Sequence, residues 1–171
     1  LITSDKRLLI STYNTVDEYN YKSEDFSHIY FSTDSLGNDQ KKHIISIYED
    51  SRKNIWIATN KGLELLNKPV KYTTGDGLPD NVIQAVTEDS KGNLWISTTK
   101  GISKFVNGIS LPKSPGFENF IKHDGLPGNE FIKRAVLKNS EGIIYFGSSE
   151  GYTFFQSDSI FKNEIVPRVV L

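Results

Sequence analysis

Residues 87–102 read TEDSKGNLWISTTKGI, and residues 48–63, YEDSRKNIWIATNKGL, repeat the same pattern. In both stretches an apolar run turns at an Asp-Ser pair, enters a second apolar run around a tryptophan, and turns again at Lys-Gly. Asp and Asn favour turns because they hydrogen-bond their own backbone, and Gly adopts positive φ at no steric cost. Trp, Ile and Thr suit a packed strand. The two stretches therefore indicate one strand–turn–strand unit that is used twice.

The unit recurs along the chain. Trp56 and Trp95 are 39 residues apart, and so are Gly62 and Gly101. A looser copy at residues 137–151 is shifted by 50 residues, so it carries an insertion of 11 residues. Self-similarity at such a period is the signature of a repeat architecture.

A second marker recurs independently of the first. Residues 76–81 (DGLPDN) and 124–129 (DGLPGN) are 48 residues apart, and each precedes an apolar run, at 82–86 and 131–137. Residues 3–12 form a fourth, degenerate copy of the strand–turn–strand unit. The positions that we assign to the structural repeat are Asp50, Trp56, Gly62, Gly77, Pro79, Asn81, Asp89, Gly92, Trp95, Gly101, Gly125, Pro127, Asn129, Gly142, Tyr145, Gly147 and Gly151.

The composition narrows the classes of function. The chain has 171 residues, enough for one sizeable core. Its net charge is −1, and its 20 basic and 21 acidic residues are spread along the chain, so the basic stripe of a nucleic-acid-binding protein is missing. The lack of cysteine excludes disulfides and thiolate metal sites. No apolar run is long enough for a transmembrane helix, and there is neither a signal peptide nor a methionine, so we expect a piece of a longer protein.

The pattern of apolar residues predicts an all-β fold. No window shows the sustained spacing of an amphipathic helix, and turn signals recur at the short intervals that are typical of sheets. The strands that we expect cover residues 8–13, 18–21, 26–31, 43–49, 54–59, 62–66, 70–74, 82–87, 94–98, 102–106, 117–122, 131–138, 143–146 and 152–155, with a turn cluster at 34–38.

The character of these strands predicts a β-propeller. Residues 55–58 and 94–96 are apolar at successive positions, which point to opposite faces, so these strands are buried on both faces. Residues 71–74 and 103–105 alternate instead, as half-exposed outer strands do. Units of four strands at this period describe propeller blades, and a ring typically has about 4 to 8 of them.

We therefore expect a fragment of about three to four four-stranded blades from a larger, seven-bladed propeller. The expected boundaries are a partial blade at residues 1–33 and blades at 34–75, 76–122 and 123–165. Residues 166–171 (VPRVVL) are expected to form an exit strand.

Three segments resemble the two-component regulator propeller repeat: residues 77–83 (GLPDNVI), 88–98 (EDSKGNLWIST) and 101–105 (GISKF). That repeat reads roughly Gly-Leu-Pro-x-Asn, then Asp-x-x-Gly-x-Leu-Trp-Ile-x-Thr, then Gly-Leu-x-x-Phe. The unit at residues 125–155 resembles the variant that closes such propellers, and the exit strand resembles the start of the β-sandwich domain that follows them. A departure is the pair Arg52-Lys53, which stands where the repeat has its turn glycine.

The resemblance implies a function that periodicity does not. Propellers of this family form the periplasmic sensor part of membrane-bound histidine kinases, notably in hybrid two-component systems of Bacteroides-type gut bacteria, whose ligands are commonly oligosaccharides. It implies that this segment senses an oligosaccharide without catalysis or cofactor, in the periplasmic part of an inner-membrane protein. The implied partners are the adjoining propeller and β-sandwich domains and a second copy of the full-length protein, and this segment is expected to contact no nucleic acid.

The side chains that could carry chemistry each have a structural alternative. Trp56 and Trp95 could stack on sugars, but apolar residues on both strand faces favour a core position between blades. Asp50 and Asp89 could bind a metal or act as acids, but no calcium-loop pattern follows, so we expect them to cap turns. We predict no catalytic residue and no metal ligand.

The histidines and a cluster of aromatic residues are weaker candidates for binding a metal or a ligand. The residues His28, His43 and His123 are isolated from any metal-site pattern and are expected at the surface or at strand edges. The place where we would look for stacking with a glycan is an aromatic cluster, at least half of which we expect in the core: Tyr13, Tyr19, Tyr21, Phe26, Tyr30 and Phe31.

Two other functions stay open at this stage. A sialidase-like, glycan-active propeller enzyme would need two carboxylates placed about 5 to 10 Å apart across one cavity. A protein-interaction scaffold would show an exposed apolar patch of several hundred Å². The sequence places no ligand-binding site.

Overall fold

The structure is a computed structural model that describes residues 1–31 and 42–160; the expected turn at 34–38 and the expected exit strand at 166–171 lie outside the described residues. The described residues form strands and four short 3-10 turns, and the prediction of an all-β fold is confirmed. The strands are β1 (Leu8–Ser11), β2 (Thr15–Asn20), β3 (Asp25–Phe31), β4 (Ile44–Glu49), β5 (Ile55–Thr59), β6 (Gly62–Leu65), β7 (Lys71–Tyr72), β8 (Ile83–Glu88), β9 (Leu94–Thr98), β10 (Gly101–Val106), β11 (Gly116–Phe120), β12 (Phe131–Lys138), β13 (Ile143–Ser148) and β14 (Gly151–Gln156). The 3-10 turns are η1 (Thr74–Asp76), η2 (Gly108–Ser110), η3 (Lys122–Asp124) and η4 (Ser157–Ser159).

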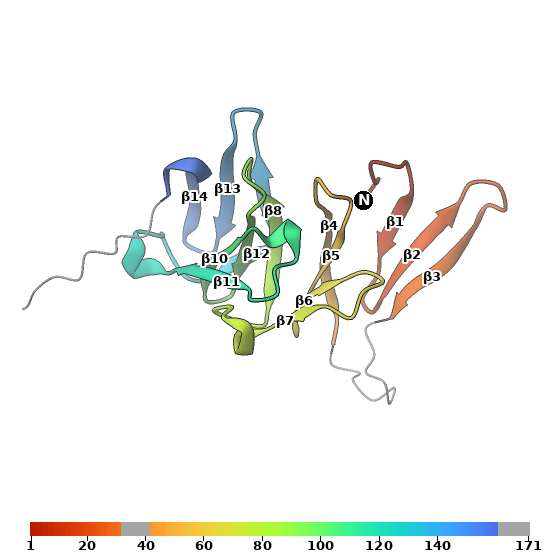
Figure 1. The fold of residues 1–171 in the computed structure, drawn as a ribbon, viewed down its shortest axis with the longest axis horizontal. Helices are drawn as coiled ribbons and strands as arrows, with labels where there is room; N and C mark the ends of the chain where they lie inside the picture. Colours follow the sequence, from red (N-terminus) through yellow and green to blue (C-terminus); the bar gives the residue numbers. More distant parts are fainter. Residues whose placement is uncertain (32–41, 161–171) are drawn as a thin grey trace, which may run out of the picture.

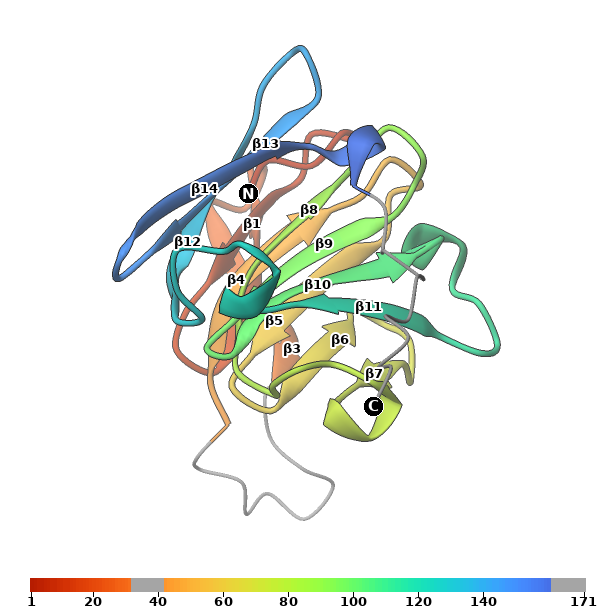
Figure 2. The same ribbon diagram turned by 90° about the vertical axis from the view of Figure 1, so that its left-hand side faces the viewer.

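The strands form four antiparallel sheets, each made of consecutive strands. We call them blade A (β1–β3), blade B (β4–β7), blade C (β8–β11) and blade D (β12–β14). Figure 1 shows the blades following one another from red on the right to blue on the left, and Figure 2 shows the strands of blade C side by side. Sequential meanders of this kind are the blades of a propeller.

Each gap between neighbouring blades holds its own apolar cluster. Ile55 and Ile57 of β5 pack toward blade A, whereas Trp56 and Ala58 of the same strand pack toward blade C. Trp95 repeats this arrangement one blade later and faces blade D. The prediction that these strands are buried on both faces is confirmed, because successive side chains of one strand fill two different interfaces.

The expectation of half-exposed outer strands is confirmed for β7 but wrong for β10. Tyr72 is buried beside exposed Lys71, whereas Ser103 and Phe105 have no exposed surface. The reason is that β10 lies inside its sheet, between β9 and β11. Blade B also covers one of its faces, through the contact of Phe105 with Trp56.

A pair of hydrogen bonds joins blades A and B, and a matching pair joins blades B and C. Ser4 donates through its amide and its hydroxyl to the Glu49 carboxylate, at 2.6 and 3.0 Å. Ser51 donates in the same way to Glu88, at 2.7 and 2.6 Å. In each case a serine in a turn of one blade donates two hydrogen bonds to the glutamate at the end of the first strand of the next blade. The Glu-Asp-Ser repeat therefore sets the position of one blade against the next, which the sequence pattern did not reveal.

Gly101 closes the turn between β9 and β10 in a backbone conformation that other residues rarely adopt, with φ of +125°. A Cβ atom there would lie 2.3 Å from the carbonyl oxygen of Phe120. We expect Gly101→Ala to lower the free energy of unfolding by about 2 to 3 kcal/mol, because strain and overlap add. Urea denaturation measures this. Gly75→Ala is the control, since Gly75 has no positive φ and its nearest contact is a side-chain hydroxyl at 3.4 Å; equal losses would contradict the prediction.

Candidate functional site

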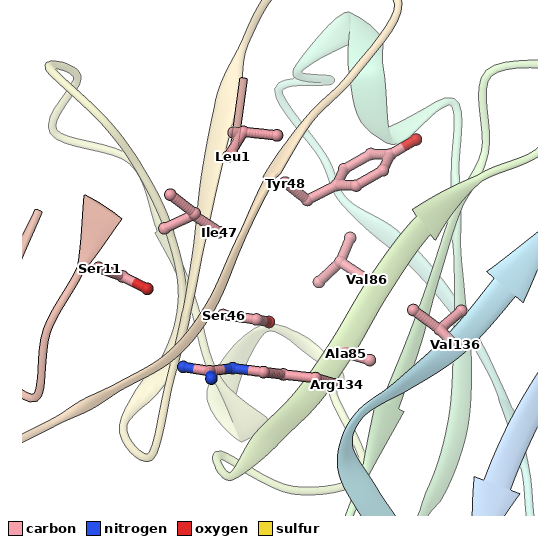
Figure 3. A pocket seen from close by; sticks show the side chains of 9 residues that line it. All are labelled: Leu1, Ser11, Ser46, Ile47, Tyr48, Ala85, Val86, Arg134 and Val136. Carbon is pink, nitrogen blue, oxygen red and sulfur yellow. The ribbon is translucent and has the colours of Figure 1, made fainter. Parts of the chain in front are cut away.

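Strands β1, β4, β8 and β12, together with Leu1, line one open cavity near the propeller axis. It has a volume of about 410 Å³ and is lined by Leu1, Ser11, Ser46, Ile47, Tyr48, Ala85, Val86, Arg134 and Val136. Figure 3 shows these side chains around the cavity; apart from Leu1, they come from β1, β4, β8 and β12. Arg134 is the only charged side chain of this lining, and the remainder is apolar or carries a hydroxyl group.

Arg134 reaches across the axis from blade D to blade B. Its Nε donates a hydrogen bond of 2.6 Å to the main-chain oxygen of Ile45. Figure 3 shows its guanidinium group directed toward the strand that carries Ser46. The backbone of Arg134 has φ of +63°, which is uncommon for a residue other than glycine and costs about 1 to 2 kcal/mol. The backbone is therefore strained at the residue whose side chain lines the cavity.

The strained backbone belongs to an enlarged β-bulge. In blade D, Phe131 pairs with Ser148 and Val136 with Phe146, so four residues of β12 lie opposite Gly147 alone. In blades B and C the same place holds a single extra residue, Ile45 or Gln84, with no residue opposite. Bulges re-aim side chains and are frequent next to functional sites. The longer bulge brings Arg134 to the cavity, and blades B and C have no bulge of this length.

Gly147 makes room for this bulge. A Cβ atom at Gly147 would lie 3.0 Å from the Cβ of Ala135, which is closer than side chains normally pack. The corresponding residues of blades B and C are Ala58 and Ser97, which face smaller bulges. Gly147 was assigned to the structural repeat, and its lack of a side chain is explained by the bulge opposite it.

A second cavity, of about 540 Å³, adjoins the first on the other side of Arg134. Its lining consists of Tyr13, His43, Ile44, Ile45, Lys133 and Arg134. The rings of Tyr13 and His43 stack on each other, with centroids 4.9 Å apart and planes inclined by 16°. The cavity therefore combines two basic side chains with a flat aromatic pair.

Tyr48 is the titratable hydroxyl group of the first cavity. Burial raises its pKa to about 12, and the negative charge of Glu88 acts in the same direction. The phenol therefore keeps its proton at neutral pH and presents a neutral hydroxyl group.

Tyr30 of the aromatic cluster packs against the core, but none of the five members whose side chains the structure describes is fully buried, against the expectation that at least half of the cluster lies in the core. Tyr13, Tyr21 and Phe26 are 64%, 62% and 49% exposed, and Tyr19 and Tyr30 are half-buried. The reason is that the core of blade A consists of Leu9 and Val16 with the facing residues of blade B. Tyr13 of the cluster lines a cavity near the axis.

The predicted turn aspartates do cap their turns, and they also bind the tryptophans. Asp89 accepts hydrogen bonds from the amides of Lys91 and Asn93 and from the Asn93 side chain, at 2.8 to 2.9 Å. It also accepts one from Trp95 Nε1, at 2.9 Å. The same four bonds surround Asp50. Trp56 and Trp95 are buried and cannot stack on a ligand, as expected.

The other repeat positions shape turns. Asn81 and Asn129 each accept a hydrogen bond from the amide of the residue seven positions earlier, at 2.8 and 2.7 Å, which closes the Gly-Leu-Pro turns. Lys53 stands where the resembling repeat has glycine and takes φ of +65°, so the turn survives the substitution. Positive φ is found at the repeat glycines Gly62, Gly77, Gly92, Gly101, Gly125, Gly142 and Gly151. Pro79 and Pro127 lie in the turns that precede β8 and β12.

The histidines do not form a common site. His28 and His123 are exposed, and His28 Nδ1 contacts the Asp17 carboxylate. His43 lies beside Tyr13 in the second cavity. Among the described residues, no group of three or more His, Cys, Asp or Glu side chains could hold a metal ion.

A comparison with protein-family models matches the two segments that contain the buried Asp–Trp pairs. Residues 40–61 and 77–100 match the two component regulator propeller. These two segments are therefore similar to the two-component regulator propeller repeat. The two matches contain Asp50, Trp56, Asp89 and Trp95, the buried pairs of blades B and C. A search of curated proteins found no match.

Solved structures similar to this chain include extracellular domains of two-component systems and an enzyme. The extracellular domain of a hybrid two-component system of B. thetaiotaomicron is 28% identical, with a TM-score of 0.73, and the match covers 92% of this chain and 21% of that one. A second such domain from the same organism is 21% identical, with a TM-score of 0.70, and the match covers 89% of this chain and 20% of that one. Virginiamycin B lyase from Staphylococcus aureus shares the fold at 14% identity and a TM-score of 0.54, and the match covers 91% of this chain and 54% of that one. The repeats thus span about a fifth of the length of the two sensor-system domains.

No helix in residues 1–31 or 42–160 has both the length and the apolar character that crossing a membrane requires. The similar domains of the two-component systems are extracellular.

Of the residues that line the axial cavities, the sequence analysis named Tyr13 and His43 but missed Lys133 and Arg134. One signal was present: the Gly-Leu-Pro markers are shifted by 48 residues between blades C and D, but the Trp95 and Tyr145 positions by 50. Blade D therefore has two more residues than blade C between the Gly-Leu-Pro marker and the Trp95 or Tyr145 position. The structure places them in the enlarged bulge of β12. Which side chain the bulge would direct to the axis could not be read from that count.

Proposed function

We propose that this chain is a ligand-sensing segment in the periplasmic part of a hybrid two-component sensor histidine kinase and response regulator, and that it detects oligosaccharides. The observation that carries the proposal is the 28% identity, over 92% of the chain, with the extracellular domain of a hybrid two-component system. The open cavities at the axis supply space for a ligand, because their volumes of about 410 and 540 Å³ lie in the range of small-molecule sites.

Sensing requires that the ligand favour one arrangement of the protein over another. The partners in this proposal are the adjoining propeller and β-sandwich domains of the same protein and a second copy of it. A ligand that binds one arrangement of these parts more tightly shifts the population toward that arrangement. The kinase on the other side of the inner membrane would respond to that shift.

The cavities support sensing over glycosidase chemistry. A glycosidase needs two carboxylates that face one substrate. Neither of the two axial cavities is lined by an acidic side chain. The likeness to the lyase is at 14% identity and concerns the fold alone.

The test is a thermal-shift screen of the intact protein against oligosaccharides from plant, host and microbial glycans. A ligand at 100 times its dissociation constant is expected to add about 2.7 kcal/mol of stability. Stabilisation by a sugar that is recovered uncleaved supports the proposal. Cleavage of the stabilising sugar would replace it with an enzymatic function, and no stabilisation across the panel would overturn it.

A further inference from the structure

We propose that the bulge of β12 forms, with Tyr13 and His43, a binding site for an acidic oligosaccharide, with Lys133 and Arg134 binding a carboxylate or sulfate group of the sugar. The inference rests on the proposed function and specifies the chemical class of its ligand. It concerns the two adjoining cavities that share Arg134.

The charge of the two cavities is of one sign. Lys133 and Arg134 are their only lining residues with a permanent charge, and no acidic side chain lines either cavity. The chain as a whole has a net charge of −1, so this positive site does not follow from composition. Walls of one sign around a partly enclosed space concentrate ions of the opposite sign. The site therefore favours an anionic ligand.

The guanidinium group of Arg134 is held in place and keeps donors available. Its Nε is bound to the oxygen of Ile45, which fixes the orientation of the planar group. Among the described residues, neither Nη1 nor Nη2 of Arg134 has a hydrogen-bond or ion-pair partner. A fork of N–H donors matches the paired oxygens of a carboxylate or a sulfate. Arg134 is thus arranged to receive such a group from the cavity side.

The local backbone supports a role in binding. The enlarged bulge occurs in blade D and not in blades B or C, and it holds Arg134 at a φ of +63°. An asparagine or a glycine would adopt this conformation with less strain. Conformational strain that one blade carries and its repeats lack is explained when the side chain placed there contacts a ligand.

The stacked pair of Tyr13 and His43 supplies a surface for the sugar ring. Tyr13 is 64% exposed, although its ring lies flat on His43. Sugar rings have apolar C–H faces that pack on exposed aromatic rings, whose polar ends keep contact with water. With the basic pair in the same cavity, this surface favours a charged sugar over a simple inorganic anion.

The test measures binding by isothermal titration to the intact protein with three galactose-based probes. These are trigalacturonate, a sulfated galactobiose and neutral galactotriose. We expect an acidic probe to bind at least tenfold more tightly than the neutral one and to lose affinity as salt rises. The tighter of the two acidic probes identifies the group as a carboxylate or a sulfate.

Charge-removing variants locate the site. Arg134→Gln is expected to lower the affinity for the acidic probe by about tenfold to a hundredfold, the usual contribution of a charge-assisted hydrogen bond. The affinity for the neutral probe is expected to stay the same. Lys133→Gln, at an exposed position, is expected to weaken it less and serves if the first variant does not fold. The matched control is Arg52→Gln, which removes one positive charge from an exposed turn outside both cavities.

Three results would overturn the inference: neutral galactotriose binding as tightly as the acidic probes, no binding of either acidic probe, or equal losses in Arg134→Gln and Arg52→Gln. Each of them leaves the proposed function standing if another oligosaccharide in the wider screen stabilises the protein. If no oligosaccharide of that screen binds, the proposed function fails as well.

Discussion

Replacing Trp95 with alanine is expected to lower the free energy of unfolding by about 3 to 5 kcal/mol. Trp95 is 1% exposed and fills the gap between blades C and D. Its ring lies 5.8 Å from that of Phe120 and 4.6 Å from that of Phe155. Removing it leaves a cavity that two β-sheets cannot close, because their strands are held by ladder hydrogen bonds. Urea denaturation, followed by circular dichroism, measures the loss.

Tyr145 provides the matched control for this prediction. It occupies the position of Trp95 in blade D, but it is half-buried and lies on the face that is turned away from blade C, beside Phe154. Tyr145→Ala is therefore expected to cost about 1 kcal/mol. Trp95→Phe keeps most of the ring and remains measurable if the alanine variant does not fold. Equal costs for Trp95→Ala and Tyr145→Ala would show that burial between blades is not what makes the repeat tryptophan important.

Replacing Asp89 with alanine is expected to cost about 3 to 5 kcal/mol, although Asp89 belongs to a turn. The residue is 3% exposed, and its carboxylate accepts four hydrogen bonds. Without it, the indole N–H of Trp95 and the side chain of Asn93 lose their acceptor inside the protein. A buried donor without a partner costs about 1 to 3 kcal/mol, and here several are left at once. Urea denaturation again gives the value.

Asn139 is the control for Asp89. It has the same place in blade D and accepts bonds from the amides of Glu141 and Ile143, but it has no tryptophan to bind. Asn139→Ala is expected to cost about 1 to 2 kcal/mol. A double-mutant cycle of Asp89→Ala with Trp95→Phe should give a coupling energy of about 1 to 3 kcal/mol. A coupling near zero would mean that the bond to Nε1 contributes no net stability.

The all-β fold and the order of its blades follow from local sequence. The turn in residues 87–102 needs Asp89 for its hydrogen bonds and Gly92 for its positive φ, and the strand after it alternates between two apolar faces. These requirements act over a few residues, so they can be read directly from the pattern. The same holds for the burial of Trp56 and Trp95, because both faces of their strands are apolar.

Contacts between side chains that are distant in sequence could not be predicted in this way. The bond from Ser51 to Glu88 joins residues 37 positions apart, and the bond from Arg134 to Ile45 joins residues 89 positions apart. Such pairs depend on how the blades are placed around the axis. The same placement leaves Tyr13 exposed, against the expectation that half of its cluster lies in the core.

The sequence by itself determined the repeat, the strands, the turns and the residues buried between blades, because each depends on neighbours within one strand–turn–strand unit. Only the tertiary structure decided where the axial cavities lie and which side chains line them. Arg134 and His43 are 91 positions apart, and they share a cavity because β4 and β12 both lie at the axis. The two residues added to the bulge of β12 change the direction in which Arg134 points. That direction depends on how β12 pairs with β13, and the order of residues along the chain does not show this pairing.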